Sequence, residues 1–427
     1  MAAGMGGESP EKNRAVRPRT RLREKQAAWQ GLVGLVLVAW ALGLAAGAAE
    51  PPRRYTGPWN LEKLKQVPPA TFGVTRGLVQ EVYYQGEPLR GKPTRVFAYL
   101  SRPEKSSGHV PGMVLVHGGG GTAFAEWATL WAQRGYAAIA MDLAGCGPDR
   151  KRLPDGGPGQ DEHSKFREFS EAETDQMWTY HAVAAVIRGH SLLAAQPGVD
   201  PQRTGITGIS WGGYLTCIVA GLDDRLKVAV PVYGCGFLHE NSAWLPQFAR
   251  MSPEQRQRWV RLFDPSQYLP GVRIPILFIN GTNDFAYPLD SYQKSYRLVP
   301  GPVDVRIEVR MRHSHPDGWA PKEIGLFVDS VLCGGDPLPR LGPTQQSGSK
   351  VWASVTAKVP LVKAELHYTL DQGPWQKRSW QSQPAALHNG MAHAELPPQR
   401  PIVYYLSVTD QRGAMVSTQH AELHGTP

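Results

Sequence analysis

The sequence predicts an α/β protein in which a mostly parallel sheet flanked by helices is followed by a small all-β sandwich domain. Short apolar runs without polar alternation recur between residues 113 and 309, and helix-like stretches separate them. After residue 350, strand-like runs with an alternating pattern recur between turn signals. Apolar strands separated by helices are typical of a parallel sheet that is buried on both faces.

Six apolar runs are the expected strands of the parallel sheet, at residues 113–117, 136–141, 205–209, 227–232, 274–280 and 305–309. Helix-like segments lie between or after them, near residues 123–134, 175–195, 212–221, 288–298 and 321–332. Two more strands are expected earlier, at residues 77–84 and 94–100, on either side of a turn with Gly and Pro. A helical insertion is expected at residues 236–270.

The composition changes after Cys333. Residues 336–350 are rich in Pro, Gly, Ser and Gln and are predicted to be a linker. The strand-like runs of residues 351–427 predict a β-sandwich accessory domain, which leaves residues 49–335 as the catalytic domain. No candidate catalytic group lies in the sandwich, so deletion from about residue 345 onward is expected to leave turnover intact.

Residues 1–48 have the order of a secretory signal. Seven basic and three acidic side chains in the first thirty residues precede an apolar stretch, which ends in Ala46-Gly47-Ala48. The alternative is an uncleaved anchor at residues 31–48, since about eighteen apolar residues are near the minimum for a membrane span. Either interpretation places the chain after residue 48 in the periplasm or outside the cell, with membrane contact only through residues 31–48.

The charge and the cysteines exclude other classes of protein. The N-terminal segment carries +4 of the net charge of +9, and no basic run with interleaved aromatic residues follows, which argues against nucleic-acid binding. Four cysteines without C-x-x-C spacing make a metal site improbable. We therefore expect no metal.

Gly208-Ile-Ser210-Trp-Gly212 is a G-x-S-x-G sequence between an expected strand and an expected helix. A sharp strand-to-helix turn with flanking glycines exposes a serine hydroxyl above the sheet, as a nucleophile requires. The helix that follows points its N-terminus at the site, which favours developing negative charge. Ser210 is therefore the predicted nucleophile.

A serine nucleophile needs a base and an acid that orients the base. Asp284 follows the strand at residues 274–280, and two histidines, His313 and His315, follow the next strand. The order Ser, Asp, His at successive strand ends is the one expected. The turn around Ser314-His315-Pro316 favours His315 as the base, with His313 as the alternative.

Backbone donors for an oxyanion are expected at two places. His117 is followed by four glycines directly after the first strand of the parallel run. We assign the donors to the N–H of Trp211 and the N–H of Gly119 or Gly120. A phosphate cradle is the alternative for the glycine run, but no G-K-[ST] follows.

Residues 75–335 resemble α/β-hydrolases. Gly208-ISWGGY is similar to the elbow of prolyl-oligopeptidase-like (S9-type) catalytic domains, and the body also resembles acetylxylan esterases and dienelactone hydrolases. The resemblance implies a triad of Ser210, Asp284 and His315 and no cofactor. Those peptidases carry a large β-propeller ahead of the catalytic domain, whereas this sequence has only a short segment there.

The predicted function is that of an exported serine esterase that cleaves carbohydrate or other small acyl esters through an acyl-enzyme on Ser210. Its expected partner is a small-molecule or polysaccharide ester. A serine peptidase of the same fold is the first alternative, and a non-catalytic binding protein on a hydrolase scaffold is the second. A complete triad in register argues against the binding protein.

Overall fold

The computed structural model describes residues 55–105 and 108–425. The predicted signal or anchor at residues 1–48 lies outside the described residues. Tyr55–Pro427 forms one compact unit. Among the described residues, no helix is long and apolar enough to cross a membrane.

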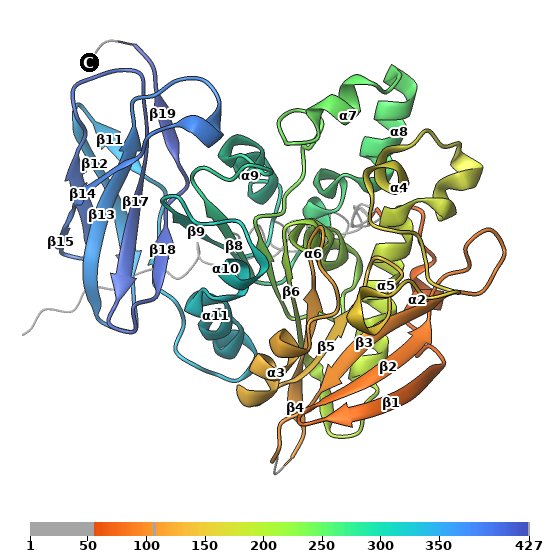
Figure 1. Cartoon of the computed structure of the whole chain (residues 1–427). Coiled ribbons are helices and arrows are strands. Elements are labelled where there is room, and N and C mark those ends of the chain that lie inside the picture. The colour runs from red at the N-terminus through yellow and green to blue at the C-terminus, as the bar shows by residue number, and fades with distance from the viewer. Residues whose placement is uncertain (1–54, 106–107, 426–427) are drawn as a thin grey trace, which may run out of the picture. The chain divides into compact units, whose positions relative to one another are not determined.

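A nine-stranded sheet with the order β1-β2-β3-β5-β4-β6-β7-β8-β9 forms the centre of this unit (Figure 1). Strands β4 to β9 are parallel, and β3, β2 and β1 extend the sheet beyond β5, each antiparallel to its neighbour. The strands are β1 (Ala70–Arg76), β2 (Val79–Gln85), β3 (Arg95–Ser101), β4 (Val110–Val116), β5 (Ala137–Met141), β6 (Val199–Ile209), β7 (Val228–Val232), β8 (Ile276–Gly281) and β9 (Val303–Glu308).

The predicted α/β architecture is confirmed. The apolar runs form the inner strands: every residue of β5, β7 and β8 is buried, as expected for strands covered on both faces. Strand β1 was not predicted, because it is an edge strand with six exposed residues and therefore lacks an apolar signal.

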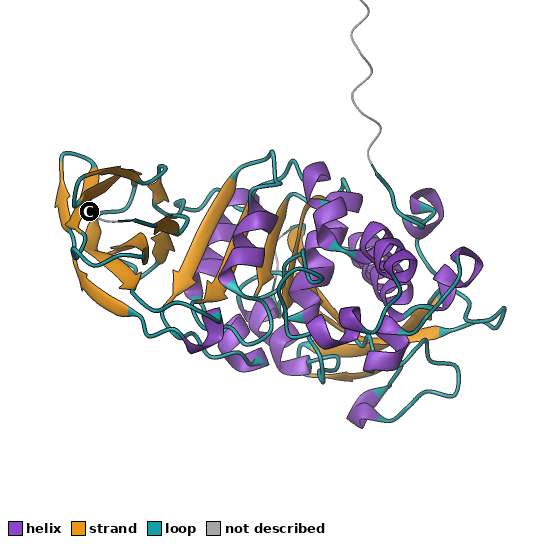
Figure 2. Ribbon diagram, turned by 90° about the horizontal axis from the view of Figure 1, so that it is seen from above, coloured by secondary structure: helices purple, strands orange, loops and turns teal. Residues whose placement is uncertain are grey.

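Helices cover both faces of this sheet (Figure 2). On one face lie α3 (Ala125–Gln133) and α11 (Lys322–Leu332). An ion pair between Arg134, at the end of α3, and Asp329 of α11 joins these two helices. On the other lie α5 (Trp178–Ala194) and α6 (Trp211–Leu222), which contact each other. The other α-helices of the described residues are α2 (Leu61–Leu64), α4 (Glu162–Phe166), α7 (Leu245–Ala249), α8 (Pro253–Phe263), α9 (Leu289–Tyr296) and α10 (His315–Trp319).

The C-terminal part consists of two antiparallel five-stranded sheets. One contains β10 (Arg340–Leu341), β11 (Gln345–Ser347), β12 (Lys350–Thr356), β15 (Ala386–His388) and β16 (Met391–Glu395). The other contains β13 (Leu361–Thr369), β14 (Gln381–Pro384), β17 (Ile402–Asp410), β18 (Met415–Ser417) and β19 (Ala421–Leu423).

Strand β17 is buried on both faces. Ile402, Tyr404 and Leu406 belong to the core between the two C-terminal sheets. Val403 and Tyr405 alternate with them and belong to the core that is continuous with the hydrolase part. The sandwich therefore packs one outer face against the rest of the chain.

The stretch predicted as a linker, residues 336–350, is built into this structure. Strands β10 and β11 both pair with β12. Arg412 donates hydrogen bonds of 2.8 Å to the carbonyl oxygens of Asp336 and Pro337. The composition predicted a linker, whereas in the structure these hydrogen bonds join the segment to its surroundings.

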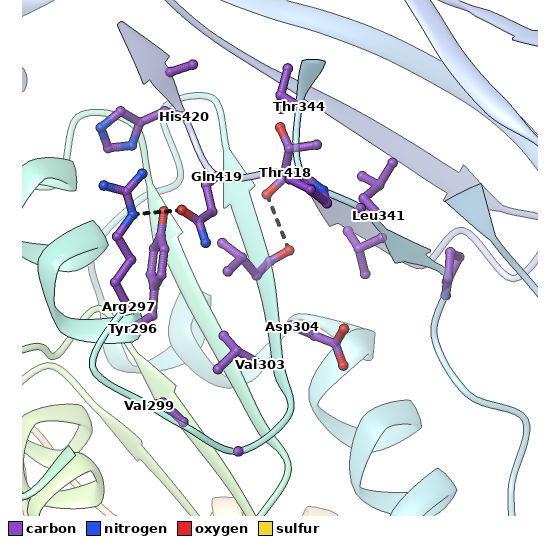
Figure 3. Close-up of a pocket in the computed structure, with 18 residues that line it drawn as sticks. Tyr296, Arg297, Val299, Val303, Asp304, Leu341, Thr344, Thr418, Gln419 and His420 are labelled. Atoms are coloured by element: carbon purple, nitrogen blue, oxygen red, sulfur yellow. Dashed lines mark hydrogen bonds between the residues drawn. The ribbon is translucent and has the colours of Figure 1, made fainter. Parts of the chain in front are cut away.

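The sandwich also contacts the edge strand β9. Ser417 Oγ accepts a 2.9 Å hydrogen bond from the Ile307 N–H and donates one of 3.3 Å to the Val305 carbonyl, which satisfies polar groups at an open sheet edge. A cavity of about 540 Å³ lies beside this contact, where Arg297 Nε donates to Gln419 Oε1 at 2.8 Å (Figure 3). The edge strand is thus covered by the sandwich.

Candidate active site

Ser210 occupies a strained turn between β6 and α6. Its backbone angles are φ 59° and ψ −118°, a conformation that L-residues rarely adopt. A Cβ at Gly208 would lie 2.2 Å from the Gly212 carbonyl oxygen, and a Cβ at Gly212 would lie 1.9 Å from that of Val116. Both flanking positions therefore require glycine, which explains the G-x-S-x-G sequence.

Asp284 follows β8 and is 2% exposed. Its Oδ1 accepts hydrogen bonds from the N–H groups of Ala286 at 2.9 Å and Tyr287 at 2.7 Å. Its Oδ2 lies 2.6 Å from His313 Nδ1. A carboxylate can only accept, so Nδ1 of His313 carries the proton and Nε2 is left free as a base.

His313 is held from a second side by Tyr233. The two rings stack with their centroids 4.2 Å apart and 21° between their planes. The Tyr233 hydroxyl donates to the carbonyl oxygen of Arg312, the residue next to His313. No local sequence pattern points to Tyr233, because it contacts His313 across eighty residues of chain.

The structure corrects the predicted pairing of Asp284 with His315. Ser314 caps α10, its Oγ accepting a 3.0 Å hydrogen bond from the Asp317 N–H. His315 is the first residue of that helix, and its Nε2 accepts a 3.0 Å hydrogen bond from the Gly118 N–H. The predicted turn around Ser314 is present, but it directs His315 to the glycine loop and leaves His313 beside Asp284.

Burial lowers the pKa of His315 to about 4, and the Arg150 guanidinium and the neighbouring imidazoles of His117 and His313 act in the same direction, because they oppose a further positive charge. The hydrogen bond from Gly118 agrees with this, because an imidazole nitrogen can accept only when it is unprotonated. His315 is therefore neutral near pH 7.

Acid is expected to destabilise the fold through His315. Between pH 6.5 and 4 the His315 imidazole binds a proton in the unfolded chain but not in the folded chain, because its pKa in the folded chain is about 4. The contribution of neutral His315 to the free energy of unfolding is therefore complete above pH 6.5 and is lost as the pH falls from 6.5 to 4. His315→Gln keeps an acceptor for Gly118 but does not titrate. Near pH 5 it should lower the slope of unfolding free energy against pH by up to about 1.4 kcal/mol per unit. Urea denaturation of both proteins at several pH values measures the slopes, and equal slopes would contradict this role.

His117 holds the glycine loop, residues 118–121, in place through hydrogen bonds at the end of β4. Its Nε2 accepts a 2.9 Å hydrogen bond from the Leu143 N–H, so Nδ1 carries the proton and donates to the Gly118 carbonyl at 2.7 Å. Burial lowers the pKa of His117 to about 4, consistent with this neutral form. The loop after β4 is thereby tied to the end of β5.

Trp211 and Gly119, two of the three predicted oxyanion donors, line the same pocket as Ser210. Trp211 opens α6, where an N–H has no partner inside the helix. The N–H of Gly118 is bonded to His315, which leaves the next two residues of the loop as donor candidates. Gly119 lines the same pocket as Ser210, and Gly120 has a φ of 66° that favours glycine.

Ser210 and His313 share a pocket of about 300 Å³. Aromatic side chains form much of its wall: Trp211 and Trp244 have ring centroids 4.4 Å apart, and Phe285 is 61% exposed. The lining residues are Gly119, Ile209, Ser210, Trp211, Trp244, Phe285, Ala286, His313, Ser314 and His315. The sequence did not point to Phe285, although it directly follows Asp284.

A second Asp–His–hydroxyl arrangement lies in the core. His190 is within 2.8 Å of Asp223 Oδ2 through Nδ1 and within 2.9 Å of Thr204 Oγ1 through Nε2. All three residues are at most 1% exposed. Because no substrate reaches a fully buried hydroxyl, we assign this arrangement a structural role.

No group of three or more His, Cys, Asp or Glu residues suited to a metal ion occurs in the described part of the chain. The four cysteines, Cys146, Cys217, Cys235 and Cys333, are free.

Comparison with known proteins identifies two matching families. Residues 60–267 match the acetyl xylan esterase (AXE1) family, and residues 247–371 match the PhoPQ-activated pathogenicity-related protein family. The acetyl esterase Axe7A of Xylanibacter ruminicola is 22% identical over 49% of this chain and 50% of its own length. The uncharacterized peptidase YuxL of Bacillus subtilis is 25% identical over 52% of this chain and 33% of its own length. The chain thus spans half or less of these curated relatives.

Among solved structures, the acetyl xylan esterase from Paenibacillus sp. R4 is 23% identical. The match covers 64% of this chain and 92% of that protein, with a TM-score of 0.52. This protein has the α/β-hydrolase fold, followed by C-terminal antiparallel sheets, and its sequence resembles acetyl xylan esterases.

Proposed function

We propose that the chain is an exported serine esterase that cleaves small acyl esters of carbohydrates or other alcohols. One observation carries the proposal: Ser210 lies on a strained strand-to-helix turn and shares a pocket with His313, which Asp284 orients. In this proposal His313 replaces His315, the base predicted from the sequence.

The proposed reaction proceeds through an acyl-enzyme. Ser210 Oγ attacks the ester carbonyl carbon while His313 Nε2 takes the hydroxyl proton, and Asp284 stabilises the imidazolium. The N–H groups of Trp211 and of Gly119 or Gly120 stabilise the oxyanion. Collapse of the tetrahedral intermediate expels the alcohol, which receives its proton from His313. Water then attacks the acyl-enzyme by the same sequence of steps and releases the acid.

Size and chemistry of the pocket support a small substrate. A volume of about 300 Å³ accommodates a short acyl group and part of an alcohol, and the rings of Trp211, Trp244 and Phe285 offer apolar contacts to them. The matches to proteins described as acetyl and acetyl xylan esterases favour an acetyl group on a carbohydrate. Export rests on the predicted N-terminal signal.

A serine peptidase is the second candidate, favoured by the match to the YuxL peptidase. A substrate panel separates the two functions. We expect p-nitrophenyl acetate and acetylated xylo-oligosaccharides to be hydrolysed, and peptide p-nitroanilides to be cleaved at least about 100-fold less efficiently in kcat/KM. Comparable kcat/KM on the anilides would instead establish the peptidase. A folded protein that cleaves neither substrate class would contradict both.

A further inference from the structure

We propose that the C-terminal sandwich positions the catalytic acid through Asn283, which makes Asn283 a positioning residue. This inference rests on the proposed role of Asp284. It assigns the sandwich a part in turnover, although the sandwich sequence contains no candidate catalytic group.

Asn283 is the residue immediately before Asp284, and its side chain points to a turn of the sandwich at residues 374–378. Nδ2 of Asn283 lies 2.7 Å from the Arg378 carbonyl oxygen, 3.2 Å from that of Gln376 and 3.3 Å from that of Trp375. An amide nitrogen has two hydrogens, so the three acceptors share two donors. A side chain that donates into such a cluster is fixed in one orientation.

The other end of the Asn283 amide is fixed as well. Its Oδ1 accepts a 2.8 Å hydrogen bond from the Thr282 hydroxyl, and Thr282 Oγ1 accepts a 3.0 Å bond from the Arg310 N–H. Arg310 has a φ of 56° and lies three residues before His313. One chain of hydrogen bonds thus joins the sandwich, the Asp284 loop and the His313 loop.

The 374–378 turn is itself anchored. Trp375 is 6% exposed, and its ring lies 5.0 Å from that of His420. The Arg378 guanidinium lies 3.8 Å from the centroid of the Trp375 ring and donates hydrogen bonds to the Gly373 carbonyl. The carbonyl oxygens that hold Asn283 therefore belong to a packed segment and not to a free loop.

Positioning matters here because a catalytic group must be held within about 0.5 Å of its productive geometry. The Asp284 carboxylate keeps its place through two backbone N–H groups of its own loop and through His313. If the loop loses its attachment to the sandwich, the carboxylate moves relative to the imidazole. The sequence predicted that residues from about 345 onward are dispensable for turnover. This inference predicts the opposite.

The test uses Asn283→Asp in the full-length chain. The substitution keeps the shape but removes the N–H donors, and it places a carboxylate against three carbonyl oxygens. We expect kcat for p-nitrophenyl acetate to fall about 10- to 100-fold with KM changed less than threefold, and the limb of the pH profile of kcat/KM that reports the base to shift. Asn283→Ala should give a similar fall in kcat, and Asn283→Ser, which retains a hydroxyl donor, should recover part of it.

Gln293→Ala is the matched control. Gln293 Nε2 also donates to a sandwich carbonyl, that of His420 at 2.7 Å, but from α9 and away from the Asp284 loop. It should leave kcat and the pH profile unchanged. Equal losses of kcat in Asn283→Asp and Gln293→Ala would show that the effect comes from a general weakening of the contact between the sandwich and the rest of the chain. That result would overturn the proposal.

Hydrogen–deuterium exchange separates this inference from the proposed function, because it needs no turnover. Asn283→Asp should speed exchange in the peptides containing residues 282–287 and 310–315, and Gln293→Ala should not. Faster exchange in a protein without esterase activity would retain the positioning role and reject the function. Unchanged exchange together with unchanged kcat would overturn the positioning role.

Discussion

His313→Ala is expected to lower kcat/KM for p-nitrophenyl acetate by about 10⁴- to 10⁶-fold, because removing the base disables the whole catalytic unit. His315→Ala should lower kcat/KM about tenfold, because the Gly118 N–H loses its acceptor and the glycine loop moves. Two histidines two residues apart thus have very different expected effects. The difference follows from one contact, the 2.6 Å approach of His313 Nδ1 to Asp284 Oδ2.

Kinetics of the two variants with the same aryl ester, after their folding has been verified by circular dichroism, decide between the histidines. His315→Gln serves as a further control, since its side chain retains an acceptor for the Gly118 N–H. An inactive His315→Ala beside an active His313→Ala would restore the assignment predicted from the sequence and reject the one drawn from the geometry.

Ser210→Ala is expected to lower kcat by about 10⁶-fold and to leave folding intact. Alanine keeps the Cβ, so the strain at φ 59° remains and the melting temperature should change little. Ser210→Gly should be equally inactive but more stable by about 1 kcal/mol, since glycine adopts a positive φ without steric cost. Thermal denaturation and initial rates measure both effects. Turnover by either variant within about tenfold of the wild type would reject the serine mechanism.

Much of the fold was predictable because the parallel strands are covered on both faces. Continuous apolar runs such as those of β7 and β8, when helical stretches separate them, are typical of a buried parallel sheet and of few other structures. The elbow was predictable for a related reason: the close approach of Gly208 and Gly212 to backbone oxygens leaves no room for a side chain. Asp284 was predictable as a site residue because it follows the end of a predicted strand.

The choice of histidine was not predictable from local sequence. On an extended segment His313 and His315 would point to the same side, so alternation does not separate them, and the restriction that Pro316 places on its neighbour favoured His315. What separates them is tertiary: the stacking of Tyr233 on His313 and the bond from Gly118 to His315. Neither contact has a signature in the sequence around the histidines.

The docking of the sandwich was also missed, although one signal was present. The run Ile402–Val408 is apolar with little alternation, which is typical of a strand covered on both faces. Its partners on the outer face, however, are set by the way the two parts pack. The hydrogen bonds of Asn283 go to backbone carbonyls, which every residue type provides, so no residue in the 374–378 turn identifies them.

Labelling with a fluorophosphonate probe, followed by peptide mapping, tests the central claim most directly. A phosphonyl adduct on Ser210 requires a serine that is both accessible and activated by a base. We expect one adduct, located on Ser210, which is absent in Ser210→Ala, formed much more slowly in His313→Ala and nearly unaffected in His315→Ala. A folded wild-type protein that remains unlabelled, or an adduct on another residue, would contradict the assignment of Ser210 as the nucleophile.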